Sequence, residues 1–164
     1  MAESGPQPTR PRTLLVLIMV LCWQVGRGTE GLVLPERSTA YHFFRAGGLT
    51  PFYFVLDAIT VAVALAALGY VWRARPGWVQ SAFVALGYFA AQAIVVTLFM
   101  LRSVDDARAA FVASRAARGQ PVDPERVERL FALGWLEWRL VMSLTVFGLA
   151  AWLVWRRRAY VGRE

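Results

Sequence analysis

Residues 123–158 read DPERVERLFALGWLEWRLVMSLTVFGLAAWLVWRRR, and this stretch decides the class of fold. Asp123 suits a helix N-cap, Pro124 suits the first helical position, and Glu125 suits the positive end of the helix dipole. Because no proline follows, the pattern predicts one helix of 35 residues from Pro124 to Arg158, about 52 Å long. A hydrocarbon core is only about 30 Å thick, so we expect this helix to cross a membrane and project from it.

The apolar part of the stretch is residues 130–155, interrupted by Glu137 and Arg139. Tryptophans gather at both ends of it, as they do at membrane interfaces; they are Trp135, Trp138, Trp152 and Trp155. We therefore predict a transmembrane helix at 130–155. The arginines that follow Trp155 predict a cytoplasmic tail at 156–164.

The composition places the whole chain in the same class. It has 164 residues, 57% of them hydrophobic, and its charges gather between long apolar runs. This indicates an all-α, polytopic membrane protein. The net charge of +7 does not indicate a nucleic-acid partner, because the basic residues flank apolar spans. All 18 basic residues are arginine and the chain has no lysine or asparagine, which is typical of a GC-rich bacterial genome.

The apolar runs predict a bundle of four transmembrane helices, the first one short. Residues 13–26 form a short first span or signal anchor, although their length also fits a cleaved signal peptide with a mature N-terminus near Thr29. We favour retention. The remaining predicted spans are 51–72, 78–101 and the 130–155 helix. A cytoplasmic tail is predicted at 1–12, before the span at 13–26.

Two segments are predicted outside the cytoplasm. The loop 27–50 contains a short expected helix at Ser38–Arg45, and the loop 102–129 contains an expected surface helix at Asp105–Arg118. The predicted cytoplasmic pieces hold 8 arginines in 26 residues, whereas the two outer loops hold 9 in 52. This density predicts a bacterial inner-membrane protein with both termini in the cytoplasm.

Catalytic and metal motifs are not evident in the chain. Cys22 is the only cysteine and His42 the only histidine, which excludes an intrachain disulfide and ligation of haem by two histidines of one chain. No nucleophile elbow or phosphate loop is present. We therefore expect a protein that is not an enzyme and needs no cofactor or metal.

Ionisable residues inside the predicted spans are the sharpest functional signal. At 1.5 Å per residue, Asp57 lies about 22 Å from Trp72, Arg139 about 24 Å from Trp155, and Gln92 about 21 Å from Trp78. These depths predict one polar layer in the outer half of the membrane, in which Asp57 and Arg139 pair and Gln92 hydrogen-bonds one of them. The alternative is that Arg139 snorkels outward and Asp57 faces another subunit. Glu137 belongs to the layer by sequence, but it lies near the interface and on the opposite helix face from Arg139.

Two further groups are candidates for contacts. Tyr41 and His42 stand in an aromatic run of the first outer loop, which predicts a segment anchored along the membrane surface. The alternative for these two residues is contact with a lipid or quinone headgroup. The small residues Ala58, Ala62 and Ala66 recur every four positions and predict a close helix–helix contact.

Three functions are compatible with these features. The leading hypothesis is a non-enzymatic accessory or assembly subunit of a larger membrane complex, with other membrane subunits or further copies as partners. The alternative is a small homo-oligomeric transporter or proton-coupled carrier that uses the polar layer. The third is a quinone- or lipid-handling membrane enzyme around His42.

Overall fold

The computed structural model describes residues 12–73 and 77–157, and all regular structure in these two ranges is helical. Residues 1–11, 74–76 and 158–164 lie outside the described residues, and with them most of the tails predicted at 1–12 and 156–164. In chain order the elements are α1 (Arg12–Val33), the 3₁₀ turn η1 (Pro35–Arg37), α2 (Thr39–Ala46), α3 (Thr50–Trp72), α4 (Trp78–Arg102), α5 (Val104–Ala117), α6 (Pro124–Phe131) and α7 (Leu133–Arg157).

Four of these helices are long and apolar enough to cross a membrane. By length and composition the candidate spans are Leu14–Val33, Thr50–Trp72, Trp78–Arg102 and Leu133–Arg156. The prediction of an all-helical chain with four apolar spans is confirmed at this level. The helix predicted at Asp105–Arg118 corresponds to α5, whose bounds are Val104–Ala117. Its position on the membrane surface and the membrane side of each loop stay predictions.

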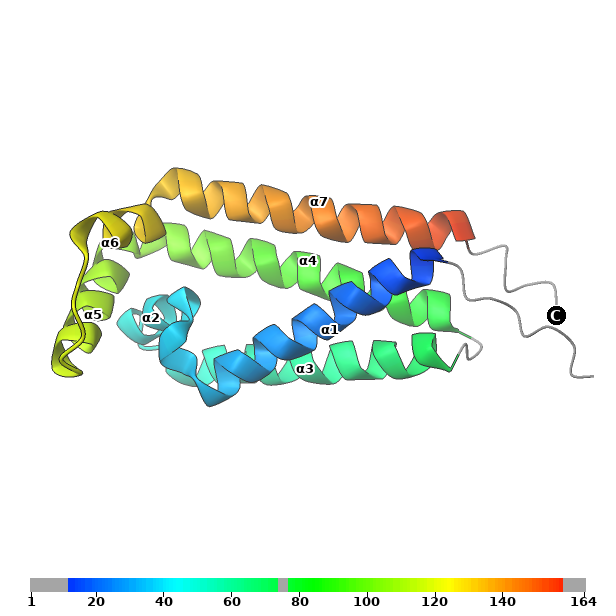
Figure 1. Cartoon of the computed structure of the whole chain (residues 1–164), viewed down its shortest axis with the longest axis horizontal. Coiled ribbons are helices and arrows are strands. Elements are labelled where there is room, and N and C mark those ends of the chain that lie inside the picture. Colours follow the sequence, from blue (N-terminus) through cyan, green and yellow to red (C-terminus); the bar gives the residue numbers. More distant parts are fainter. Residues whose placement is uncertain (1–11, 74–76, 158–164) are drawn as a thin grey trace, which may run out of the picture.

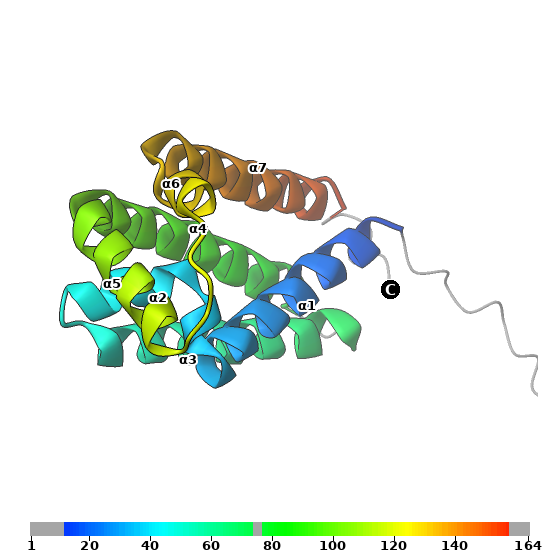
Figure 2. The same ribbon diagram turned by 60° about the vertical axis from the view of Figure 1, so that its left-hand side comes forward.

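The four long helices form an antiparallel bundle (Figure 1). α1 packs on α3, α3 on α4 and α4 on α7, and a smaller contact between α1 and α7 closes the ring. The short helices α2, α5 and α6 lie together at one end, which we call the capped end (Figures 1 and 2). α1 begins and α7 ends at the opposite end, which we call the terminal end.

Buried positions recur at alternating spacings of four and three, the pattern of helices that pack in a left-handed bundle. In α1 this stripe is Leu17, Leu21, Gln24, Gly28 and Gly31. In α3 the buried residues are Tyr53, Thr60, Ala64, Ala67 and Val71. The predicted packing residues Ala58, Ala62 and Ala66 are instead exposed, because they lie on the face of α3 that points away from the bundle. Within this chain the close contacts of α3 therefore use other small residues.

The first span is longer than the predicted 13–26. α1 has 22 residues and continues past residue 26, through Gly28 and Gly31. The reason is a close approach to α3: a Cβ atom at Gly28 would lie 2.8 Å from Val61 Cγ2 and 3.2 Å from the Asp57 carbonyl oxygen. Gly31 is equally crowded, since a Cβ there would meet the Asp57 carboxylate. The glycines thus form a helix contact and not a helix end.

The single helix predicted from Pro124 to Arg158 is wrong, because the chain breaks at Ala132. Asp123 caps α6 as expected, accepting hydrogen bonds from the backbone N–H of Glu125 at 3.0 Å and of Arg126 at 3.3 Å. Ala132 then adopts an extended conformation with ψ 132°, and α7 begins at the next residue. The break lets Phe131 pack among the short helices at the capped end, with its ring centroid 5.4 Å from that of Phe43 and its side chain 3% exposed.

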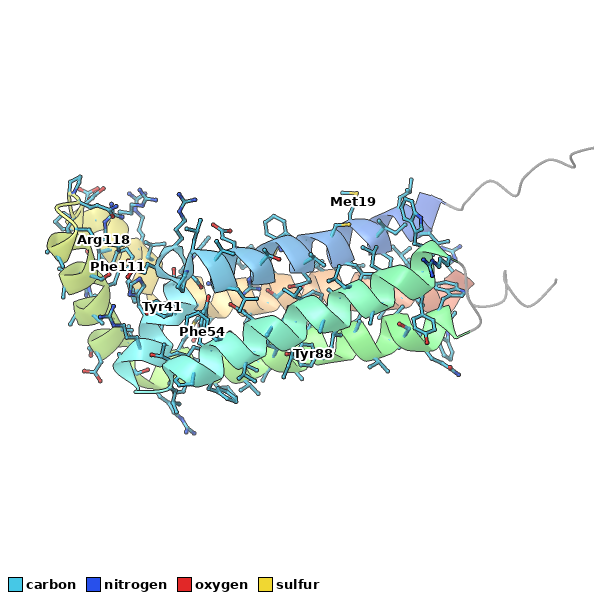
Figure 3. All side chains as sticks on the ribbon, turned by 90° about the horizontal axis from the view of Figure 1, so that it is seen from below. Met19, Tyr41, Phe54, Tyr88, Phe111 and Arg118 are labelled. Atoms are coloured by element: carbon cyan, nitrogen blue, oxygen red, sulfur yellow. The ribbon has the colours of Figure 1, made fainter. Side chains whose placement is uncertain are left out.

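The cap is a second apolar core built by the short helices. α2 buries Phe43 and Phe44 completely, and α5 and α6 contribute Phe111 and Phe131. Figure 3 places Tyr41 of α2 at the same end as Phe111 of α5 and Arg118, the residue that follows α5. An ion pair between Arg118 and Glu36 ties the end of α5 to η1. Both of its side chains are more than a third exposed, so it contributes little beside the aromatic packing.

His42 lies inside this cap with no exposed surface. Its Nε2 lies 3.1 Å from the Glu36 carbonyl oxygen, and its ring packs edge-on against Phe111 with 5.0 Å between centroids. Nδ1 has no hydrogen-bond partner in the described structure. The predicted headgroup contact by His42 therefore does not fit, because burial removes its ring from the surface; Tyr41 is only half-buried.

We predict that Gly28→Leu destabilises the protein by about 1–3 kcal/mol, because the new side chain has to displace the backbone of α3. Thermal unfolding in detergent, followed by circular dichroism, measures this loss. Gly26→Leu is the matched control, since nothing lies within 4 Å of a Cβ atom at that position. Equal melting temperatures for the two variants would contradict the close approach of α1 and α3.

We predict that the cap loosens in mild acid. Burial lowers the pKa of His42 below its usual value of 6.5, and the nearby Arg118 and Arg45 act in the same direction, against the opposing effect of Glu36. The stability from neutral His42 is therefore complete above pH 6.5 and declines as the pH falls below it.

Hydrogen exchange of the α2 amides, corrected for intrinsic rates, should be faster at pH 5.5 than at pH 7.5. His42→Gln removes the titrating group and should abolish most of this difference. The same protection of wild-type α2 at both pH values would disprove the effect.

Candidate functional site

A cavity of about 240 Å³ lies between the two apolar cores. One core lies between the long helices toward the terminal end and includes Phe89 and Phe147, which bound the cavity on one side. The other core is the cap, whose Phe44 bounds the cavity on the opposite side. Polar side chains from α1, η1, α2, α3, α4 and α7 and the loop before α2 make up much of the remaining wall: Gln24, Arg27, Glu30, Arg37, Ser38, Thr39, Tyr53, Asp57, Gln92, Thr97, Arg139 and Ser143. The cavity is therefore a polar chamber within an apolar bundle.

The inward stripes of the helices explain why the chamber is polar. In α1 the stripe passes from Leu17 and Leu21 to Gln24, and in α7 it passes from Arg139 and Ser143 to Phe147. Each stripe is apolar in the terminal half and polar toward the cap. Polar groups inside an apolar bundle are costly unless they are hydrogen-bonded, so such a chamber suits water or a polar ligand.

The three deep residues of the predicted polar layer come together here. Asp57, Gln92 and Arg139 all line the cavity, from α3, α4 and α7 respectively. Glu137 does not line it; its side chain is exposed on the outer face of α7, two residues from Arg139. The helix geometry that separates Glu137 from Arg139 follows directly from their spacing in sequence.

The predicted pairing within the layer is wrong. No ion pair joins Asp57 and Arg139 within 4.0 Å in the described structure. Asp57 instead accepts a hydrogen bond from the Tyr53 hydroxyl and interacts electrostatically with Arg27 of α1.

Gln92 also has a different partner from the one predicted. The Thr60 hydroxyl donates to Gln92 Oε1 at 3.0 Å and to the Leu56 carbonyl oxygen at 2.7 Å, so the two acceptors share its one proton. The Ser143 hydroxyl donates to the Arg139 carbonyl oxygen at 2.8 Å. The Thr60–Gln92 hydrogen bond joins α3 to α4, and the Ser143 hydrogen bond lies within α7. The Arg139 guanidinium forms no hydrogen bond in the described structure.

The mouth of the cavity faces the capped end. Arg27, Glu30 and Arg37 line the cavity with exposed side chains, and all three lie near the end of α1 or in η1. The exposed part of the lining is therefore at this end. The other end of the chamber meets the apolar core of the terminal half.

Sequence reasoning missed several residues of the site, and some had a usable signal. Tyr53 stands four residues before Asp57, a spacing that places two side chains on one helix face. Gln24 continues the stripe of Leu17 and Leu21, but the short first span predicted at 13–26 hid that pattern. Nothing in sequence marks Arg27, because the chain was expected to have left the membrane there.

The described residues contain no group of three or more His, Cys, Asp or Glu side chains that could hold a metal ion. The cavity lining offers hydrogen-bonding and charged groups, which suit the binding of a polar solute. Comparisons with protein families, with curated proteins and with solved structures gave no match to this chain.

We predict that Asp57 is coupled to Arg27 and not to Arg139. In double-mutant cycles, Asp57→Asn with Arg27→Gln should show a coupling free energy above about 0.5 kcal/mol, whereas Asp57→Asn with Arg139→Gln should be additive within about that value. Chemical or thermal unfolding in detergent measures each cycle. A strong coupling of Asp57 with Arg139 would restore the ion pair that the sequence predicts.

Proposed function

We propose that this protein is a non-enzymatic, multi-pass membrane subunit that binds a small polar solute in the chamber between its spans, as an accessory component of a larger membrane complex. The observation that carries the proposal is a polar chamber with an exposed mouth at the capped end and an apolar core behind it. A chamber of about 240 Å³ is smaller than most drug-sized sites, which favours a small ligand.

The apolar core behind the chamber distinguishes binding from transport. All four long helices contribute to it, through Leu21, Ala64, Ala85 and Ala150 among others, and each of these is at most 1% exposed. A carrier made from this chain would have to separate that packing to open toward the terminal end. An accessory subunit needs only the opening of the chamber at the capped end. Binding of the solute there would then affect the partner subunits.

The proposed location is a bacterial inner membrane, with both termini in the cytoplasm and the capped end outside. Basic residues at the terminal end support this orientation, since Arg12, Arg73 and Arg156 all lie there. In this orientation the mouth of the chamber faces the periplasm.

The structure gives less support to a quinone- or lipid-handling enzyme around His42. The imidazole is buried in the aromatic cap, away from the residues that line the chamber. A headgroup could reach it only if α2 and α5 separated.

We predict that Ser143→Cys reacts with a membrane-impermeant thiol reagent added to the periplasmic side, whereas Ala150→Cys does not. Both positions lie on the inward face of α7, seven residues apart, and only Ser143 lines the chamber. Cys22, an exposed cysteine, is first replaced by serine to remove the background. Mass spectrometry of the purified protein measures labelling.

The outcomes separate the three functions. Labelling of Ser143→Cys from the cytoplasmic side alone would overturn the orientation, and labelling of both positions would favour a transport route. In mild detergent, partner subunits in fixed stoichiometry support the accessory role, a defined homo-oligomer alone supports a carrier, and a bound quinone supports the enzyme.

A further inference from the structure

The positive charge in the chamber exceeds the negative charge. Three arginines, Arg27, Arg37 and Arg139, line it together with two acids, Glu30 and Asp57. The side chains of Arg27 and Arg37 are exposed, whereas that of Arg139 is half-buried. Arg139 is therefore the arginine of the chamber whose charge is least accessible to water.

No protein group in the described structure neutralises Arg139. It forms no ion pair within 4.0 Å, and its side chain donates no hydrogen bond to a protein atom. The charge that acts on it is Arg27, which has the same sign. A charged side chain inside a span is costly and normally faces a counter-charge or a functional cavity, and Arg139 has only the cavity.

The neighbouring amides add hydrogen-bond donors. Gln92 uses its Oε1 toward Thr60, which leaves its NH₂ group available to the chamber. Gln24 is 3% exposed, lines the same chamber and has no hydrogen bond to another residue in the described structure. A guanidinium with five N–H donors, flanked by two amides, matches the acceptor geometry of a carboxylate or phosphate group.

We propose that the chamber binds a small organic oxyanion, a carboxylate or a phosphate, whose negative group is held by Arg139 with Gln92 and Gln24 as further donors. This proposal rests on the proposed function, because it requires that solutes reach the chamber. Asp57 and Tyr53, on the α3 wall, limit the site to one negative group, since a second would face the carboxylate. The oxyanion can come from a soluble solute or from a lipid headgroup, and both present the same chemistry.

The test uses full-length protein purified in a neutral detergent, with acetate, inorganic phosphate and glycerol 3-phosphate as probes at constant ionic strength. Calorimetry or a shift in melting temperature measures binding. We expect at least one probe to bind, and Arg139→Gln to weaken its binding at least about tenfold, as for other charge-assisted hydrogen bonds. Arg156→Gln is the matched control, because it removes an arginine of the same helix that lies outside the chamber over Trp152.

A second variant keeps the test decisive if Arg139→Gln fails to fold. Arg139→Lys retains the charge but loses the bidentate fork, so we expect affinity between those of wild type and Arg139→Gln. Binding of methylammonium in place of the anions, or anion binding equal in wild type, Arg139→Lys and Arg156→Gln, would overturn the proposal.

Native mass spectrometry separates the two sources of the oxyanion. Retention of an anionic lipid by wild type and Arg156→Gln, but not by Arg139→Gln, identifies a headgroup; binding of the soluble probes with no retained lipid identifies a solute. The absence of both overturns the proposal. If Ser143→Cys is labelled but no anion binds or protects it, the solute-binding function stands and the oxyanion assignment falls.

Discussion

The close approach of α1 to α3 is the constraint on which the rest of the structure depends. Gly28 and Gly31 remove the side chains that would keep the two helices apart, and their places are taken by atoms of Val61 and Asp57. α1 therefore crosses the bundle obliquely along α3 and has a smaller contact with α7 (Figures 1 and 2). The space left between them in the capped half is where Arg139 and the chamber lie.

The polar chamber lowers the stability of the folded protein, and this loss of free energy is evidence that the chamber has a function. Polar atoms taken from water without partners lose free energy, and an unpaired charge in a membrane loses more. An apolar layer at Gln24, Gln92 and Arg139 would extend the packing of the terminal half without this cost. The protein instead keeps polar side chains from three helices around one space, which is the arrangement expected where a ligand supplies the missing partners.

The cap decides how the chamber meets the solvent. The break at Ala132 turns α6 across the end of the bundle, and Phe131 then joins Phe43 and Phe111 in a second apolar core. This core covers the chamber, while the exposed arginines at the end of α1 and in η1 leave a polar way in. The two ends of the chamber therefore differ: the capped end is partly open, and the other end is closed by the apolar core.

The sequence by itself determined the all-helical class of fold, the four long apolar helices and the helix N-cap at Asp123, and it predicted that Asp57, Gln92 and Arg139 lie at a similar level. These follow from local rules, because the rise per residue and the length of an apolar run do not depend on neighbouring helices. Only the tertiary structure decided the partners. Which face of α3 turns inward, why Ala64 is buried and Ala62 is exposed, and why Asp57 meets Tyr53 and Arg27 all depend on the rotation and spacing of whole helices. Rotation and spacing are set by the joint packing of every helix in the bundle, and no single stretch of the chain encodes them.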